Sequence, residues 1–92
     1  MEYNQVDGRK MMNINVQLFS PLKEFSGASR VALELPEPAT AADMIEVLAA
    51  RYPAMLPFLR NAQVVINDDM VGRLQLLQEG DEVQLRVPMF GG

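Results

Sequence analysis

The chain has 92 residues, a length typical of one domain. It carries 8 Lys+Arg against 12 Asp+Glu, for a formal net charge of −4, and 49% of its residues are hydrophobic. Because it has no Cys and no His, the composition excludes disulfides, thiolate zinc sites and self-contained Ser-His-Asp or Cys-His catalytic sites. The acidic balance argues against a nucleic-acid backbone as partner and favours a basic protein surface.

The N-terminal residues predict neither a membrane span nor a secretory signal. No apolar run approaches the roughly 20 residues that cross a bilayer, and residues 1–10 lack the apolar centre of a signal peptide. Residues 1–11 are polar and show no period, so we expect a disordered extension there, with an added strand as the alternative. Residues 12–92 are predicted to form a single domain. We expect a soluble cytoplasmic protein.

Two alternating segments predict an antiparallel hairpin. Apolar residues occupy every second position from Asn13 onward, as in a half-buried strand. Residues 20–30 form a wide loop that can hold a helical turn at residues 22–25, and a second alternating strand follows. The inward positions of the two strands are Ile14, Val16, Leu18, Val31, Leu33 and Leu35.

A helix is predicted after this hairpin. Thr40 is a good N-cap, and Asp43 stands three residues later in a variant of the capping box. Residues 41–52 carry apolar side chains at helical spacing, and Pro53 ends the pattern. Residues 55–59 are apolar but interrupted by proline, so we expect an irregular turn that packs on the core. The predicted apolar positions of the helix are Ile45, Leu48, Ala49 and Tyr52.

The remaining segments complete an α+β domain. We predict a short strand at residues 63–66, a turn at 67–69, a brief edge strand at 70–71 and a last strand with Val83, Leu85 and Val87 inward. One helix then covers one face of a mixed sheet. This order of elements fits the ubiquitin-like β-grasp fold.

The chain ends in Gly91-Gly92, directly after the last predicted strand and the short segment 88–90. Glycine has no side chain, so such a tail is thin and conformationally free. It can pass through a narrow channel of a partner and present its terminal carboxylate there. A frayed end is the plain alternative. The position directly after a terminal strand of a β-grasp pattern favours a functional tail.

Several apolar side chains fall outside the predicted core. Phe19 lies on the polar side of the first strand, Met70 follows a polar turn, and Met89 and Phe90 lie beyond the last inward residue. Isolated exposed apolar residues are common. If Phe19, Met70 and the tail share one face, they form a patch that marks a partner site.

Acidic residues cluster at Asp68-Asp69 and at Glu79, Asp81 and Glu82. Both clusters stand at predicted turns and bring no other ligand type. We therefore predict turn-forming and solvated charges there, rather than a metal site or an acid–base pair. The arginines are dispersed and the aromatic residues have no basic ladder beside them, so no nucleic-acid binding is predicted.

Together, the segments INVQLF, PLKEFSG and LQEGDEVQLRVP and the terminal GG resemble the MoaD/ThiS family of ubiquitin-like sulfur carriers. The resemblance covers residues 12–92 and is most specific in the EGDEV turn followed by the diglycine. The wide loop between the first two strands favours the MoaD type, the small subunit of molybdopterin synthase.

This resemblance implies that a ubiquitin-activating-type adenylyltransferase uses ATP to adenylate the C-terminal carboxylate, which then becomes a thiocarboxylate. Gly92 would carry the adenylate and the sulfur, and Gly91 would keep the passage narrow. The large subunit of molybdopterin synthase would receive the tail during molybdenum cofactor biosynthesis. Phe19 and Met70 match apolar positions that the family uses against partners. The carrier itself is expected to bind no cofactor and to have no autonomous catalysis.

Three departures from the family pattern surround the tail. Arg86 stands where the MoaD type often has an aromatic residue, Val87-Pro88 replaces a frequent Pro-Pro, and Met89-Phe90 is bulkier than the usual small residues. The predicted partner contacts are Phe19, Met70, Arg86, Pro88, Met89 and Phe90.

Two alternatives stay open. The same activation could serve a ubiquitin-like modifier that forms isopeptide bonds with lysines, or a sulfur carrier for thiamine or another metabolite. The chain could also be a plain β-grasp interaction module whose diglycine is incidental.

Overall fold

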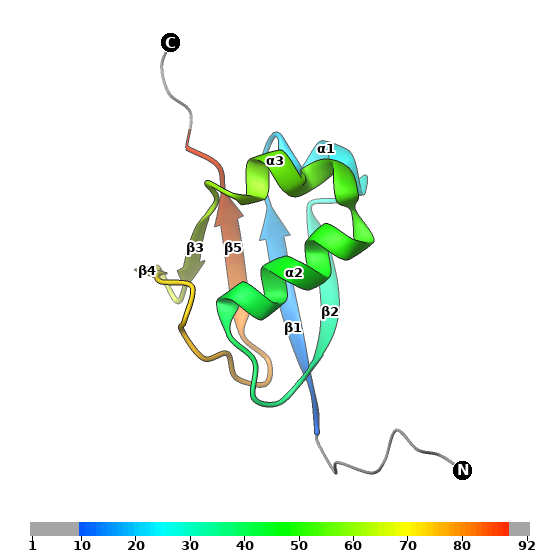
Figure 1. The fold of residues 1–92 in the computed structure, drawn as a ribbon. Coiled ribbons are helices and arrows are strands. Elements are labelled where there is room, and N and C mark those ends of the chain that lie inside the picture. Colours follow the sequence, from blue (N-terminus) through cyan, green and yellow to red (C-terminus); the bar gives the residue numbers. More distant parts are fainter. Residues whose placement is uncertain (1–9, 89–92) are drawn as a thin grey trace, which may run out of the picture.

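Five strands form one mixed sheet in the order β2-β1-β5-β3-β4 (Figure 1), in a computed structural model that describes residues 10–88. β1 and β5 pair in parallel, and the other neighbouring strands pair antiparallel. The last strand along the chain therefore lies at the centre of the sheet. The strands are β1 (Met11–Leu18), β2 (Arg30–Pro36), β3 (Gln63–Ile66), β4 (Asp69–Val71) and β5 (Glu82–Arg86).

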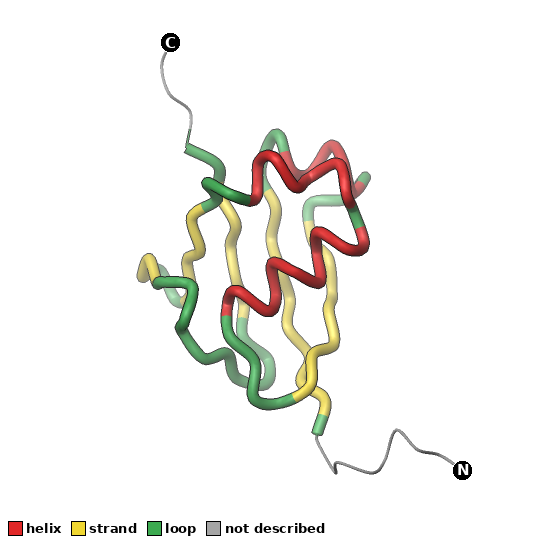
Figure 2. Tube along the Cα trace, in the orientation of Figure 1, coloured by secondary structure: helices red, strands yellow, loops and turns green. Residues whose placement is uncertain are grey.

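One main helix lies across one face of this sheet, as Figure 2 shows. This is α2 (Ala41–Arg51), and the shorter helical pieces are α1 (Leu22–Ser26), the 3-10 turn η2 (Pro53–Met55) and α3 (Leu56–Leu59). A mixed sheet with its central strand last in the chain and one helix across it is the ubiquitin-like β-grasp arrangement. The predicted fold class is confirmed.

The predicted hairpin is confirmed, with Ile14 opposite Leu33 and the alternate positions of both strands buried. β1 begins two residues earlier than the pattern indicated, at Met11. The carbonyl of Lys10 even accepts a hydrogen bond from the Glu37 amide at 2.8 Å. Residues 1–9, most of the predicted extension, lie outside the described residues.

The N-terminus of α2 has the predicted capping box. Thr40 Oγ1 accepts from the Asp43 amide at 3.3 Å, and Asp43 Oδ2 accepts from the Thr40 amide at 2.8 Å. The helix buries Met44, which the predicted stripe omitted, whereas Tyr52 is half-buried and follows the last helical residue. Pro53 directly after Tyr52 explains this early end, since a residue before proline avoids the helical region.

The expected irregular turn at residues 55–59 is instead helical. η2 and α3 both carry a proline at their first or second position. At those positions the missing amide has no partner within the helix, so Pro53 and Pro57 start helical turns rather than interrupt them. Met55 and Leu59 are buried, which confirms that this segment packs on the core.

Two residues connect β3 to β4, as the turn-forming sequence predicted. Asn67 and Asp68 have φ angles of 54° and 69°, in the left-handed region that a two-residue hairpin turn requires. Asn and Asp tolerate this region better than other non-glycine residues. Ile66 and Asp69 are then paired, which fixes β4 as the edge strand.

No helix within residues 10–88 is long and apolar enough to span a membrane.

Candidate functional site

The sheet has one face covered by helices and one face left open. The open face consists of the strand positions that alternate with the buried ones. Most of these side chains are amides or charged groups, whereas their alternating neighbours are aliphatic. The open face comprises Met11, Asn13, Asn15, Gln17, Arg30, Ala32, Glu34, Pro36, Gln63, Val65, Met70, Glu82, Gln84 and Arg86.

Phe19 and Arg86 meet where the last strand leaves the sheet. Because β1 and β5 are parallel and Leu18 lies beside Leu85, the next residues along both strands emerge at the same edge. The guanidinium carbon of Arg86 lies 5.0 Å from the centroid of the Phe19 ring, within the range of a cation–π contact. Arg86 Nε and Nη2 also donate to Gln84 Oε1, at 3.3 and 2.9 Å. A cation therefore covers the ring that was predicted as an apolar contact.

Met70 shares the open face with Phe19 but does not touch it. Met70 pairs with Val65, and Val65 pairs with Gln84, so β3 and β5 lie between the two predicted contacts. Three strand spacings correspond to about 14 Å. Met70 is 65% exposed, and a hollow of about 150 Å³ beside Val65 and Gln84 lies next to the β3–β4 turn. Met70 and Phe19 are therefore two separate apolar side chains on a mostly polar face.

The tail begins beside Phe19 and Arg86. β5 ends at Arg86, and the next two residues, Val87 and Pro88, are half-buried and belong to no helix or strand. Val87 packs against the core, as its predicted inward position requires. The predicted site residues Met89, Phe90, Gly91 and Gly92 lie outside the described residues.

The acidic residues around residue 80 form hydrogen bonds within the chain. Glu79 Oε1 accepts from the Asn13 amide at 3.0 Å, and Asp81 Oδ2 accepts from the Gln78 amide at 2.9 Å. Asp81 thus stabilises the turn before β5, as predicted, whereas Glu79 joins this segment to β1. Glu82 lies 2.8 Å from the Arg30 guanidinium on the open face. Within residues 10–88 no three His, Cys, Asp or Glu side chains are placed to hold a metal ion.

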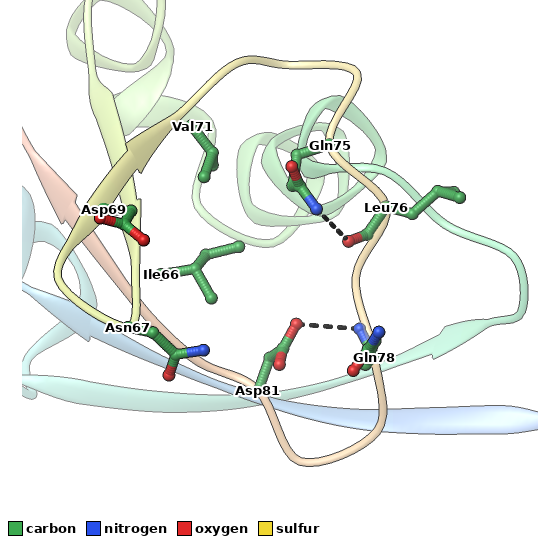
Figure 3. A pocket seen from close by; sticks show the side chains of 8 residues that line it. All are labelled: Ile66, Asn67, Asp69, Val71, Gln75, Leu76, Gln78 and Asp81. Carbon is green, nitrogen blue, oxygen red and sulfur yellow. Dashed lines mark hydrogen bonds between the residues drawn. The ribbon is translucent and has the colours of Figure 1, made fainter.

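A hollow of about 250 Å³ lies at the other end of β5, between the β3–β4 hairpin and the segment before β5 (Figure 3). Ile66 and Val71 line one side, and Asp81 faces them beside the amide of Gln78. The side chains of Asp81 and Gln75 in this hollow already form hydrogen bonds within the chain, since Gln75 Nε2 donates to the Leu76 carbonyl at 3.1 Å. The whole length of β5 separates it from the tail, and we assign no chemistry to it.

The segment between β4 and β5 exposes two leucines that the sequence analysis did not single out. Leu74 and Leu76 are 85% and 57% exposed, whereas Leu77 is buried. The Leu77 amide donates to the Ala39 carbonyl at 2.9 Å, and the Ala41 amide donates to the Gln75 carbonyl at 2.9 Å. Contacts with the start of α2 therefore decide which leucine is buried, and no sequence period could have identified it.

These features define a ubiquitin-like β-grasp protein whose central strand runs toward a C-terminal diglycine. The ThiS family model matches residues 16–92, a span that includes this diglycine. The chain belongs to the ThiS family.

Individual relatives agree with this assignment. The chain is 28% identical over 85 residues to the molybdopterin synthase sulfur carrier subunit of Drosophila yakuba, covering 89% of this chain and 93% of the relative. Its fold matches small archaeal modifier protein 1 of Haloferax volcanii with a TM-score of 0.75 and 23% identity, over 85% of this chain and 99% of the other. It also matches a chain from the complex of subunits 1 and 2 of the Helicobacter pylori molybdopterin-converting factor, with a TM-score of 0.63 and 20% identity, over 88% and 100%.

Proposed function

We propose that this protein is a sulfur carrier that acts as the small subunit of a molybdopterin synthase. The observation that carries the proposal is the ThiS family match, which continues through Gly92. Four curated relatives, at 22–28% identity, bear the name molybdopterin synthase sulfur carrier subunit. In this proposal the carboxylate of Gly92 is the reactive group, and Gly91 keeps the tail narrow.

The chemistry follows from the reactivity of that carboxylate. A carboxylate is a poor electrophile, so it first attacks the α-phosphate of ATP on the activating enzyme, forming an acyl-adenylate and releasing pyrophosphate. A sulfur nucleophile then displaces AMP and leaves a thiocarboxylate. The thiocarboxylate is a soft nucleophile that transfers sulfur without any cysteine in the carrier. A chain with no Cys and no His is compatible with this division of labour.

Two partners are part of the proposal, an adenylyltransferase of the ubiquitin-activating type and a synthase large subunit. The Helicobacter pylori complex pairs a similar fold with a second subunit, which supports an assembly of this kind. We assign the contact surface to the open face around Phe19, Arg86 and Pro88, next to the start of the tail, with Met70 as a more distant contact. Met89 and Phe90, which follow Pro88 in the sequence, complete the proposed partner contacts.

The test is intact-mass spectrometry after incubation with the adenylyltransferase, ATP and a sulfur donor. Replacing oxygen with sulfur has nearly the same nominal mass change as oxidation of one of the 7 methionines, so the C-terminal peptide must be fragmented. We expect sulfur on Gly92 only when ATP is present. An unmodified Gly92, in a mixture where an established carrier reacts, would contradict the proposal.

A second step identifies the destination. The thiocarboxylated protein is mixed with the large subunit and a pterin precursor, and the loss of sulfur from Gly92 is measured together with the product. Sulfur transfer to the pterin supports the synthase role. Tryptic peptides that carry the tail on lysine side chains would instead identify a ubiquitin-like modifier.

A further inference from the structure

Strand β2 forms an edge of the sheet with outward-facing backbone groups. Within residues 10–88 it pairs only with β1. The Leu18 amide donates to the Ser29 carbonyl at 2.7 Å and the Glu37 amide to the Lys10 carbonyl at 2.8 Å, at the two ends of the ladder. In an antiparallel pair, residues whose backbone bonds to the neighbouring strand alternate with residues whose backbone points away from it. Since Ser29 and Glu37 bond to β1 and to Lys10 directly before it, the odd-numbered residues of β2 bond to β1. Ala32 and Glu34 consequently turn their amides and carbonyls away from the sheet.

One side chain already reaches this edge. Arg51, at the end of α2, donates from Nη1 to the Ala32 carbonyl at 3.4 Å. The contact is long and Arg51 is exposed, so an incoming backbone amide can replace it. The position of Arg51 shows that the outward carbonyl of Ala32 is accessible to a donor.

A groove of about 410 Å³ lies beside this edge, on the helix-covered side of the sheet. Its floor includes Val47 and Ala50 from α2, together with Leu35 and Pro36 from β2. Residues 43, 46, 47 and 50 follow helical spacing and present one side of α2 to the groove. An added strand along β2 would alternate its side chains between this groove and the open face.

The groove has an acidic rim at the Pro36 end. Asp43 and Glu46 line it, and Glu37 follows Pro36 directly. Lys10 adjoins Glu37 in the β ladder, so among the described residues here the carboxylates outnumber the cation. At the opposite end of the edge, Arg51 supplies positive charge. The rim therefore attracts a basic side chain at one end of an incoming strand.

We propose that the β2 edge and this groove, together called the edge groove, bind an extended basic segment of a partner protein by strand addition. The segment pairs its backbone with Ala32 and Glu34, inserts an aliphatic side chain between Val47 and Ala50, and places a Lys or Arg against the acidic rim. A second copy of this chain is the alternative occupant: antiparallel edge pairing would place each acidic rim near the Arg51 end of the other copy, but both chains would carry a net charge of −4, whereas a basic segment is attracted to the rim. The groove lies at the Pro36 end of β2, at the opposite end of the sheet from Phe19, Arg86 and Pro88, so this site and the contact surface proposed around those residues can be occupied at once.

The probe is a blocked synthetic peptide of alternating Val and Thr that ends in two Lys residues. It is titrated into the full-length protein while backbone amide shifts are followed by NMR. We expect the largest shifts at Ala32, Glu34, Val47 and Ala50. Two matched peptides serve as controls. One ends in two Glu residues, and the other carries N-methyl groups on the backbone amides that would face β2.

The protein variants separate charge from backbone pairing. Glu46→Arg, an exposed change on the rim, should weaken peptide binding by roughly five- to tenfold, more at low salt than at high salt. Ala50→Arg should fill the groove and weaken binding at least as much. Glu24→Arg on α1 makes the same charge change away from the groove and should leave affinity within about twofold. Melting temperatures show that each variant is folded.

The outcomes decide the proposal. It is supported if the Lys peptide binds at the edge groove while the Glu and N-methyl peptides bind at least about tenfold more weakly. Equal binding of all three peptides, absence of binding, or shifts on Gln17 and Gln84 of the open face would overturn it. Concentration-dependent shifts of Ala32 and Glu34 without peptide would overturn it in favour of a second copy. The sulfur-transfer assay above is independent of these results.

Discussion

The same strands form both faces of the sheet, but one face is buried under the helices and the other is open. On β5, Val83 and Leu85 are buried under the helices, whereas Gln84 and Arg86 lie on the open face. Successive side chains of a strand point to opposite faces, so every second residue faces the core and the residues between them face the surface. A shift of one residue in register would exchange the two sets. The residues that stabilise the core therefore alternate with those of the proposed contact surface, and substitutions can separate the two roles.

The tail follows β5 in the sequence, and its removal should have the largest functional effect. Deleting Gly91-Gly92 should abolish sulfur transfer, because no carboxylate would reach the activating centre. The midpoint of thermal unfolding should stay within about 2 °C, because the β-grasp core is untouched. The measurement is thiocarboxylate formation by mass spectrometry beside a melting curve. A truncated protein that still carries and transfers sulfur would refute the assignment of Gly92.

A substitution on the covered face should cost the most stability. Leu85 is fully buried on the central strand, so Leu85→Ala should lower the free energy of unfolding by about 3 kcal/mol. Gln84→Ala, the neighbouring open-face residue, is the matched control and should change it by less than about 0.5 kcal/mol. Urea denaturation measures both. Equal losses for the two variants would show that the faces are not energetically distinct.

On the open face, Phe19→Asp and Met70→Asp should weaken partner binding by roughly tenfold, because each places a charge where we assign an apolar contact. Phe19→Asp should be the more damaging, since Phe19 lies next to Arg86 and the start of the tail. Calorimetry with the large subunit measures the affinity, and melting curves report stability. A large fall in melting temperature with unchanged affinity would mean that the wrong face was assigned.

The smallest effect is expected for the ion pair on the same face. Glu82 and Arg30 lie 2.8 Å apart, but both side chains are exposed, so Glu82→Gln should cost no more than about 0.5 kcal/mol. Added salt should reduce the difference between the two proteins further. Denaturation at low and high ionic strength measures it. A salt-independent loss of more than about 1 kcal/mol would show that this face also carries stability.

Much of the fold could be predicted because its signals are local. The alternation around Ile14 and Leu33, the Thr40–Asp43 capping box and the Asn67-Asp68 turn each depend on a few neighbouring residues. The helical form of residues 55–59 was mispredicted, since whether Pro57 breaks or begins a helix depends on where the preceding turn ends.

Some features of the candidate site could likewise be predicted from the sequence, and others could not. Phe19 could be placed outside the core from its phase along the first strand, and Met70 from its position after a polar turn. Both lie on the open face. Their separation depends on the order in which the strands assemble, which strand periodicity does not specify. The cation–π contact of Arg86 likewise requires β1 and β5 to be parallel neighbours, although they are far apart in sequence.

The sequence by itself determined the α+β class, the buried positions of each main strand and the diglycine on which the proposed chemistry rests, because periods, caps and turns are properties of short segments. Only the tertiary structure decided that β5 is central, that Leu77 rather than Leu74 is buried, and that β2 offers an open edge beside a groove with an acidic rim. These depend on long-range pairing. The free energy of this pairing comes from burying apolar surface between segments distant in the chain, and no local sequence pattern predicts which segments will meet.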